Sequence, residues 1–360
     1  MSITRDAARI EVAGHPPVAG LAFRHATSAD WDALASVLNA SRRADGVDEV
    51  RTGEDLRAEY EPLDAFRTER DLILAAVDGT IVGFAFGILV HRDGALVGET
   101  WGSVMDEWRH HGIGTAMWRW NRERLIGEAA ADPRPGPRQL RGFALDTEHA
   151  DLALFADQGY VPIRFGFEMR RFLAGPLPEH PLPPGLEIRP VTPETQRAIF
   201  DADNEAFEDH WGHREQSEGD FTARFRGPDV DTSLWRVAWD GDEIAGVVMN
   251  VIFRGENEEL GVQRGWLDHV SVRRPWRGKG VAKALCALSF GALRDRGMTE
   301  AWLGVDGSNP TGALQLYEGL GFSVARRWQA YGRPMDRPAP PHWSPTADAT
   351  GTKQAATPDR

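Results

Sequence analysis

Apolar and polar segments follow one another in the same order twice along this sequence. In each round a short strand is followed by polar stretches of helical character and then by two apolar strands that meet at an Asp-Gly pair, a frequent hairpin turn. The strand pairs are predicted over 72–77 and 81–89 in the first round and over 234–239 and 244–251 in the second. The repeated pattern predicts two copies of one domain.

The second copy shows the remaining elements most clearly. A strand over 266–272 runs into a turn that contains two glycines, and apolar residues at helical spacing predict a helix from residue 281. A strand over 301–305, a short helix over 312–320 and a last strand from Phe322 follow. Strands and helices mixed in this order predict an α/β or α+β fold with a mixed sheet.

Local matches between the copies indicate where each begins and ends. Arg109-His-His-Gly-Ile-Gly114 corresponds to Arg277-Gly-Lys-Gly-Val-Ala282, and four such matches recur in the same order at offsets of 162–168 residues. We expect an N-terminal arm over 1–20, a first domain over 21–173, a proline-rich linker over 174–185, a second domain over 186–337 and a disordered tail over 338–360.

Composition narrows the class of protein. The formal net charge of −13 disfavours binding to nucleic acid, and the longest apolar run, 81–90, is much shorter than the roughly 20 residues of a membrane span. The charged N-terminal residues do not form a secretory signal, so we expect a cytoplasmic protein that does not contact a membrane. Cys286 is the only cysteine, which excludes an intrachain disulfide.

The glycine-bearing turn of the second copy has the chemistry of an anion site. The start of a helix leaves backbone N–H groups unpaired, and Gly278 and Gly280 let a ligand approach the main chain. Arg277 and Lys279 add charge that suits a diphosphate. The spacing fits neither a Walker A loop nor a dinucleotide-binding turn. A basic turn that only caps the helix is the alternative.

The same turn resembles motif A of the GCN5-related N-acetyltransferases (GNAT). The family pattern Arg/Gln-x-x-Gly-x-Gly/Ala is met by Arg277, Gly280 and Ala282. The segment Asn309-Pro-Thr-Gly-Ala-Leu-Gln-Leu-Tyr-Glu-Gly-Leu-Gly-Phe322 is similar to a second family motif. Because the second copy carries both motifs and the first copy matches less well, the resemblance implies two tandem GNAT-type acyl-CoA N-acyltransferase domains.

The resemblance also implies an activity and a site. The enzyme would transfer an acetyl group from acetyl-CoA directly to a primary amine, and we expect a small-molecule acceptor. The pantetheine arm would pair with the strand edge at Val270 and Val272, as an added strand does, and would contact Asn309. Tyr317 would protonate the departing thiolate, since a phenol has a pKa of about 10. The pyrophosphate would lie on the backbone of Arg277, Gly278, Lys279, Gly280, Val281 and Ala282.

The general base is less clearly marked than the acid. Asp268 is the first candidate, because it lies on the strand that enters the turn. Glu256, Glu258 and Glu259 in the preceding segment compete with it. Many GNAT enzymes have a carboxylate two residues before Asp268, where this chain has Trp266.

A second cluster of polar residues precedes the hairpin of the second copy. His210 and His213 have the spacing of one helix face, but no further His or Cys cluster completes a metal site, and we expect no metal. Glu208, Asp209 and Trp211 fit a wall that attracts a cationic amine, or equally a solvated helix end.

The first copy keeps only part of the pattern. Arg109, Gly112 and Gly114 retain the anion-binding geometry, whereas Phe155 stands in the place of Tyr317. A phenyl ring cannot donate a proton, so we expect a degenerate copy that binds CoA or braces its partner. A catalytically silent acyl-CoA sensor and an enzyme for protein amines remain alternatives for the whole chain.

Overall fold

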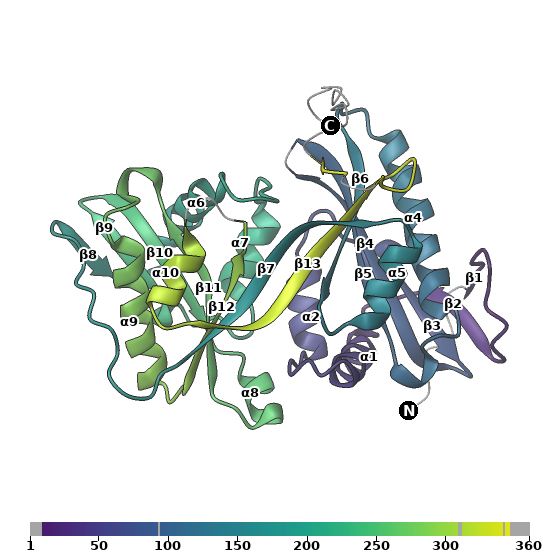
Figure 1. The fold of residues 1–360 in the computed structure, drawn as a ribbon, viewed down its shortest axis with the longest axis horizontal. Coiled ribbons are helices and arrows are strands. Elements are labelled where there is room, and N and C mark those ends of the chain that lie inside the picture. Colours follow the sequence, from purple (N-terminus) through teal and green to yellow (C-terminus); the bar gives the residue numbers. More distant parts are fainter. Residues whose placement is uncertain (1–8, 93, 309–311, 341–342, 346–360) are drawn as a thin grey trace, which may run out of the picture. The chain divides into compact units, whose positions relative to one another are not determined.

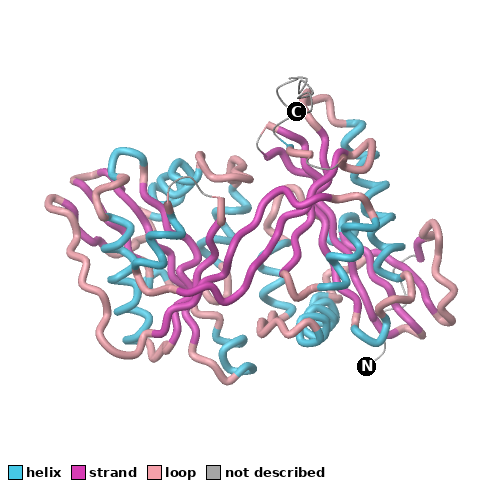
Figure 2. Tube along the Cα trace, viewed as in Figure 1, coloured by secondary structure: helices cyan, strands magenta, loops and turns pink. Residues whose placement is uncertain are grey.

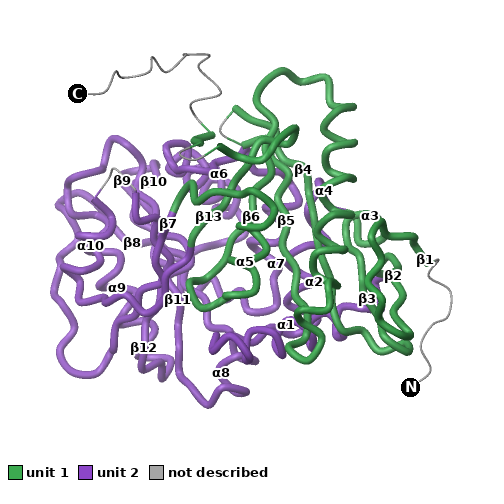
Figure 3. The backbone as a smooth tube through the Cα atoms, turned by 45° about the vertical axis from the view of Figure 1, so that its right-hand side comes forward, with its two compact units in different colours: residues 1–26, 67–164, 329–360 green, residues 27–66, 165–328 purple. Residues whose placement is uncertain are grey.

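The computed structural model describes residues 9–92, 94–308, 312–340 and 343–345. These residues form helices that pack on mixed sheets, with loops between them (Figure 1, Figure 2). The predicted mixed α/β fold is confirmed. Two compact units are present, coloured separately in Figure 3. Unit 1 combines 1–26, 67–164 and 329–360, and unit 2 combines 27–66 and 165–328. In the described part of the chain, no helix has both the length and the apolar character of a bilayer span.

Unit 1 is a sheet with the strand order β1-β2-β3-β4-β5-β6-β13. Strands β2 to β5 are antiparallel neighbours, and β5 pairs with β6 in parallel. Helix α4 packs on β3, β4 and β5 through buried side chains such as Met117 and Leu125. The elements are β1 (Arg9–Ile10), β2 (Leu21–His25), α3 (Thr68–Asp71), β3 (Leu72–Val77), β4 (Thr80–Arg92), β5 (Ala95–Val104), η1 (Asp106–Trp108), α4 (Ile113–Ala131), β6 (Arg138–Leu145), α5 (His149–Asp157) and the end of β13 (Ser323–Pro334).

Unit 2 is a sheet with the strand order β7-β12-β11-β10-β9-β8. Only β11 and β12 are parallel neighbours in it, as β5 and β6 are in unit 1. The elements are α1 (Trp31–Ala44), α2 (Gly53–Tyr60), β7 (Val161–Phe172), β8 (Leu186–Arg189), α6 (Gln196–Phe207), α7 (Glu218–Arg226), η2 (Thr232–Leu234), β9 (Arg236–Asp240), β10 (Glu243–Val251), α8 (Arg254–Leu260), β11 (Arg264–Val272), η3 (Arg274–Trp276), α9 (Val281–Asp295), β12 (Glu300–Asp306) and α10 (Ala313–Gly319).

Helices of unit 2 contact the sheet from both faces at β10. Asn250 of β10 donates a hydrogen bond of 2.9 Å to Ser289 of α9, whereas the preceding residue, Met249, contacts Arg224 of α7. Because successive side chains of a strand point to opposite faces, α9 covers one face and α7 covers the other. Helix α6 also packs on β10 and β11. The chemistry described below lies on the α6–α7 face.

The compact units do not coincide with the two sequence copies. The last strand of the first copy, β7, pairs with β12 of the second copy from Gly166 to Phe172. The last strand of the second copy, β13, in turn follows β6 in the strand order. Helices α1 and α2 of the first copy belong to unit 2. The compact units therefore divide the chain at other places than the sequence repeats, and the domains at 21–173 and 186–337 stay a prediction.

The predicted linker lies within the described residues, whereas much of the two predicted terminal segments does not. The proline-rich segment 174–185 contains no helix or strand, as five prolines dictate. Most of the predicted tail 338–360 and the first part of the predicted arm 1–20 lie outside the described residues.

Candidate active site

Strand β11 carries one residue more than its neighbour β10. Met249 of β10 pairs with His269, and the next residue, Asn250, pairs with Leu267, so Asp268 has no partner across this ladder. Such a β-bulge bends the strand and redirects nearby side chains. Asp268, the predicted general base, is this extra residue, and its side chain is 54% exposed.

On its other side, β11 separates from β12 next to the bulge. Parallel pairing joins Arg264–Trp266 to Glu300–Trp302. Strand β11 continues to Val272, and among the described residues β12 offers it no further partner. Val270 and Val272 lie on this stretch, whose edge toward β12 is available to a ligand that pairs as a strand. Asn309, predicted to contact the same arm, lies outside the described residues.

The glycine turn lies between η3 and α9. Gly278 and Gly280 have φ angles of 73° and 88°, and a Cβ added to either would meet nothing within 4 Å. Gly280 N-caps α9 without a side-chain cap hydrogen bond, so the first N–H groups of the helix point toward an open surface. Lys279 is exposed in the same turn, and Val281 and Ala282 begin the helix.

The side chain of Arg277 forms hydrogen bonds that hold the turn in place. Its Nε donates to the carbonyl of Val272 at 2.9 Å, and another guanidinium nitrogen donates to the carbonyl of Ala206 at 2.9 Å. Asp209 accepts from Arg277 at 2.7 Å and from Arg274 at 2.7 Å. The Arg277 guanidinium is thus paired within the turn, and the suitability of its charge for a diphosphate stays a prediction.

Glu208 and Asp209 form ion pairs with the arginines of the turn. Hydrogen bonds from Arg274 and Arg277 hold the pKa of Asp209 well below its usual range. Glu208 lies 3.3 Å from Arg274. Glu208, Asp209 and Trp211 are all absent from the lining of the pocket described below.

Tyr317 lies on α10 in the core of unit 2. It is 7% exposed, and its ring centroid lies 5.9 Å from that of Phe322. Burial, with the neighbouring Cys286, raises the pKa of the Tyr317 phenol well above its usual range. The phenol therefore stays protonated at neutral pH, as a proton donor must.

Trp266 occupies the place of the family carboxylate and is held in an aromatic and arginine-rich cluster. Its ring centroid lies 5.6 Å from that of Trp302, and the guanidinium groups of Arg264 and Arg326 lie 4.8 and 5.2 Å from the Trp302 ring. Because an indole N–H donates but accepts no proton, Trp266 cannot act as a base.

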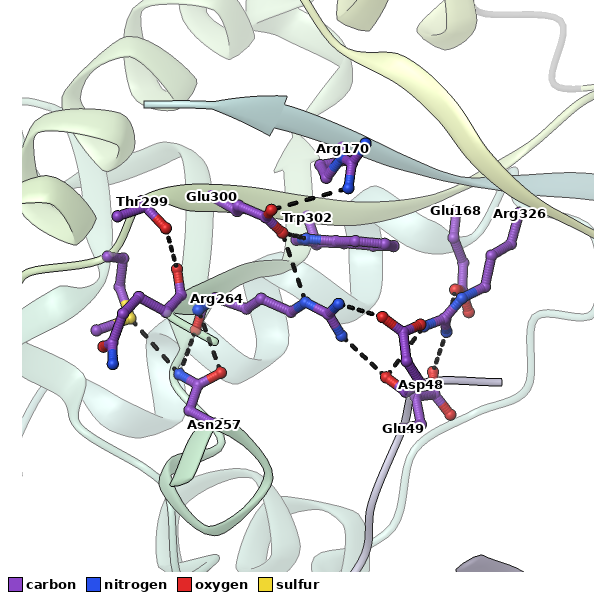
Figure 4. Close-up of polar contacts among 12 residues, drawn as sticks. Asp48, Glu49, Glu168, Arg170, Asn257, Arg264, Thr299, Glu300, Trp302 and Arg326 are labelled. Carbon is purple, nitrogen blue, oxygen red and sulfur yellow. Dashed lines mark hydrogen bonds and ion pairs between the residues drawn. The ribbon is translucent and has the colours of Figure 1, made fainter. Parts of the chain in front are cut away.

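The same arginines attach a segment of the first copy to unit 2. Figure 4 shows Arg264 and Arg326 converging on Asp48, which precedes α2. Arg264 also donates to the Asp48 carbonyl at 2.9 Å, and Arg326 pairs with Glu49 and Glu168 at 2.9 Å each. The two arginines are largely buried, whereas Asp48 is about half exposed, and these ion pairs hold the segment before α2 against the second copy.

A pocket of about 570 Å³ lies within unit 2 and adjoins the bulge. Both copies line it: α2 contributes one wall, α7 and the loop after it another, and the ends of β10 and β11 form the floor. The polar lining consists of Arg51, Asp55, Glu59, Arg214, Asp220, Arg224, Asp229, Asn250, Asp268 and His269. A pocket of this size suits a small organic molecule.

Carboxylates outnumber arginines in this lining by five to three. Two of the arginines are paired within the lining, Arg51 with Glu59 at 2.5 Å and Arg214 with Asp220 at 2.6 Å. Asp229, whose pKa is raised by burial, accepts a backbone hydrogen bond of 3.3 Å. The excess negative charge favours a cationic ligand.

His269 has a buried carboxylate behind it. Its Nδ1 lies 3.0 Å from Asp203 of α6, a residue without exposed surface, and Arg224 lies 3.0 Å from the same carboxylate. Burial alone would raise the pKa of Asp203, but His269, Arg224 and Ser271 together lower it to about 2. Asp203 interrupts the apolar stripe of α6, which is a signal for this pair in the sequence. Neither residue is among the sequence predictions above.

The other acidic and histidine candidates lie away from the pocket lining. Glu256, Glu258 and Glu259 belong to α8, and none of them lines the pocket. The Glu256 carboxylate accepts from the backbone N–H of Val50 at 3.4 Å. His210 packs 4.4 Å from the Phe207 ring. Within the described ranges, no group of three His, Cys, Asp or Glu side chains could hold a metal ion.

Unit 1 repeats the turn in a more closed form. Gly112 N-caps α4 with a φ of 82°, and Arg109 donates to the carbonyl of Val104 at 3.2 Å, as Arg277 does in unit 2. However, Pro16 lies 3.5 Å from a Cβ added to Gly112. Gly114, the second residue of the helix, lies beside Val104.

The chain is similar in sequence and in structure to known proteins. Residues 197–322 match the model of the acetyltransferase (GNAT) family. A mycothiol acetyltransferase of Salinispora arenicola is 32% identical over 304 residues, which cover 83% of this chain and 91% of that protein. A mycothiol acetyltransferase of Frankia alni is 30% identical, with coverage of 88% and 96%.

Solved structures extend the likeness to both copies. A GCN5-related N-acetyltransferase from Sphaerobacter thermophilus is 26% identical, with a TM-score of 0.67 and coverage of 88% of this chain and 96% of that one. A tandem GNAT protein from the clavulanic acid biosynthesis pathway shares the fold at 16% identity, with a TM-score of 0.62 and coverage of 88% and 98%. The predicted tandem GNAT architecture, similar to that of mycothiol synthase, is confirmed. The chain belongs to the GNAT family and is an acyltransferase that takes acyl-CoA as its co-substrate.

Proposed function

We propose that unit 2 transfers an acetyl group from acetyl-CoA to a primary amine of a small molecule. One observation carries this proposal: a pocket with an excess of carboxylates meets β11 at its bulge, beside the strand edge that β12 does not use. The pocket attracts an alkylammonium ion, and the open edge accepts the arm of the co-substrate. The names of the relatives, which are mycothiol acetyltransferases, support a small-molecule acceptor.

Each part of the site has a task in this reaction. The backbone N–H groups from Arg277 to Ala282 bind the pyrophosphate, and the Val270–Val272 edge orients the arm beside the bulge. Acetyl-CoA supplies the thioester. A backbone N–H at the bulge stabilises negative charge that develops on the carbonyl oxygen. Tyr317 donates its phenolic proton toward the sulfur that leaves.

The acceptor nitrogen must first lose a proton, because an alkyl amine with a pKa of about 10.4 is protonated at neutral pH. Asp268 is the base that the sequence favoured, and it lines the pocket. The first copy has a part in the reaction as well, since α2 supplies Asp55 and Glu59 to the acceptor pocket and the segment before it supplies Arg51. This role does not require the first copy to bind acetyl-CoA.

The test combines a binding and a turnover measurement. Calorimetry with acetyl-CoA should give a saturable heat, and a thiol-release assay over a panel of small primary amines should find an acceptor. A peptide with a free N-terminus and a lysine side chain serves as the comparison. Binding without turnover on any amine would contradict the proposal in favour of a silent sensor, and turnover on the peptide alone would contradict the small-molecule acceptor.

A further inference from the structure

We propose that His269 is the general base that takes the proton from the acceptor amine, and that Asp203 is its positioning residue. The inference rests on the proposed function and deepens it, because it replaces Asp268 as the base. It starts from the placement of His269, which lines the acceptor pocket as the residue directly after the bulge.

The hydrogen bonds around the ring leave one nitrogen for the substrate. Asp203 is buried and ionised, with a pKa of about 2, so its carboxylate can only accept hydrogen bonds. The Nδ1 of His269 at 3.0 Å therefore carries a proton and donates it to this carboxylate. A neutral imidazole with its proton on Nδ1 has a lone pair on Nε2. That lone pair is what a base at the pocket requires.

Charged groups of α6, α7 and the strand itself lie close to the imidazole. Arg224 of α7 lies 3.2 Å from Nδ1, and one carboxylate oxygen of Asp203 lies 3.0 Å from both groups, so it can accept from the guanidinium and from Nδ1–H together. On the strand itself, Asp268 lies 4.0 Å from Nε2. Phe207 of α6 packs on the ring with a centroid distance of 5.1 Å. Two carboxylates and one guanidinium thus face the imidazole, so the groups around the ring carry a net negative charge.

Asp268 is a poorer base than an imidazole in the same place. It is half-exposed and has no buried partner to orient it, and carboxylates ordinarily titrate near pH 4, far below the ammonium group of the acceptor. Imidazole exchanges protons near neutral pH, where general-base catalysis is most effective. Asp268 is better suited to attract the ammonium group toward Nε2.

The protons balance in this scheme. The acceptor ammonium gives one proton to Nε2 of His269, which later releases it to solvent. The nitrogen then forms a bond to the carbonyl carbon while the carbon–sulfur bond breaks. Tyr317 gives its phenolic proton to the sulfur. The nitrogen then loses its second proton, and this proton restores the phenol of Tyr317. The products are the amide and the free thiol.

The first experiment measures kcat/KM against pH for His269→Gln. The variant keeps the size of the side chain and part of its polarity but cannot take up a proton. We expect a loss of about 10² to 10⁴-fold and the disappearance of the fall in rate on the acid side, with acetyl-CoA affinity unchanged by calorimetry. Asp203→Asn should reduce the rate and shift the profile, and Asp203→Glu should restore part of the rate. The exposed histidine of α5 supplies the control His149→Gln, which should behave as wild type.

Opposite outcomes separate the inference from the proposed function. If Asp268→Asn loses the acid limb and His269→Gln keeps it, the base is Asp268 and the proposed function stands. If the wild-type chain turns over no amine, the proposed function fails and the general-base role fails with it. A ¹⁵N spectrum of the histidine rings then still reports the dyad: we expect the Nδ1–H form for His269, lost in Asp203→Asn. An Nε2–H form in the wild type would overturn the inference.

Discussion

Strands β5 and β11 each pair in parallel with the next strand of their sheet, β6 and β12. They differ in the antiparallel ladder that each forms with the preceding strand. In unit 1, β5 pairs with β4 without interruption from Ala95 to Val104. In unit 2, β11 bulges at Asp268 opposite β10. Trp101, which pairs with Phe86, corresponds to His269, which pairs with Met249. Where unit 1 has a regular ladder and a tryptophan, unit 2 has a bulge and a histidine.

A second difference lies on the helix that follows each parallel pair. Phe155 of α5 stacks on Tyr331 with a centroid distance of 5.1 Å, and its ring lies 2.5 Å from a Cβ added to Gly142 of β6. Tyr317 of α10 takes the same place in its own copy with a hydroxyl group added. Two copies of one fold can therefore diverge by a few residues, so that one keeps a proton donor while the other fills the space with an apolar ring.

Deletion of Asp268 tests whether the bulge creates this difference. The deletion should join Leu267 directly to His269 and give β11 the uninterrupted ladder of β5. We expect kcat to fall by about 10² to 10³-fold, the usual loss of one oxyanion donor. Calorimetry should show little change in acetyl-CoA affinity, and Asp268→Ala, which keeps the residue count, should lose less. A deletion variant as active as Asp268→Ala would show that the bulge has no catalytic role.

Tyr317→Phe removes the phenol oxygen and gives the second copy the phenyl ring that the first copy has at Phe155. If the phenol protonates the thiolate, kcat should fall by about 10²-fold or more, while acetyl-CoA binding stays nearly unchanged. Thiol release and calorimetry measure the two effects. The reverse change, Phe155→Tyr, should leave unit 1 inactive, because β5 lacks the bulge. Full activity in Tyr317→Phe would remove this residue from the mechanism.

Glu59→Gln tests the part that the first copy plays in the second copy's chemistry. The change removes the charge that pairs with Arg51 at 2.5 Å and so takes one negative charge from the acceptor pocket. We expect the KM of a cationic amine to rise by about 5 to 10-fold, the worth of roughly 1 kcal/mol between partly exposed charges, with kcat nearly constant. Asp201→Asn, at an exposed position of α6, is the matched control. An unchanged KM would place the acceptor away from α2.

The smallest expected effect concerns the pH dependence of the stability of unit 2. Burial and the charge of Glu49 raise the pKa of both Glu168 and Glu256 from 4.5 to about 7. Between these values the folded state binds more protons than the unfolded state, so the free energy of unfolding should fall as the pH rises from 4.5 to 7. Urea midpoints from tryptophan fluorescence should decrease across this window. In Glu168→Gln and Glu256→Gln the decrease should be shallower, and a midpoint that rises with pH would contradict the account.

Local patterns predicted much of the fold and part of the site. Asp-Gly pairs and apolar runs indicated the hairpins, and Gly280 indicated the start of α9, because these features act over a few residues. The partners of β7 and β13 were beyond this reasoning, since pairing between distant segments leaves no local mark. The bulge was missed for a similar reason: Asp268 looks like any polar residue on a strand until the register of β10 is known. His269 becomes a candidate only when α6 brings Asp203 to it.

One matched pair of variants tests most directly whether unit 2 alone is catalytic. Gly280→Asp and Gly112→Asp each place a carboxylate at the N-terminus of the helix that follows the turn, at φ angles of 88° and 82°. Thiol release should be abolished in Gly280→Asp, with acetyl-CoA affinity lowered by about 10²-fold through charge repulsion and lost backbone contacts, while Gly112→Asp should keep near wild-type kcat. Circular dichroism spectra should match the wild type in both. A well-folded Gly112→Asp that releases no thiol, beside an active Gly280→Asp, would contradict the account and assign catalysis to unit 1.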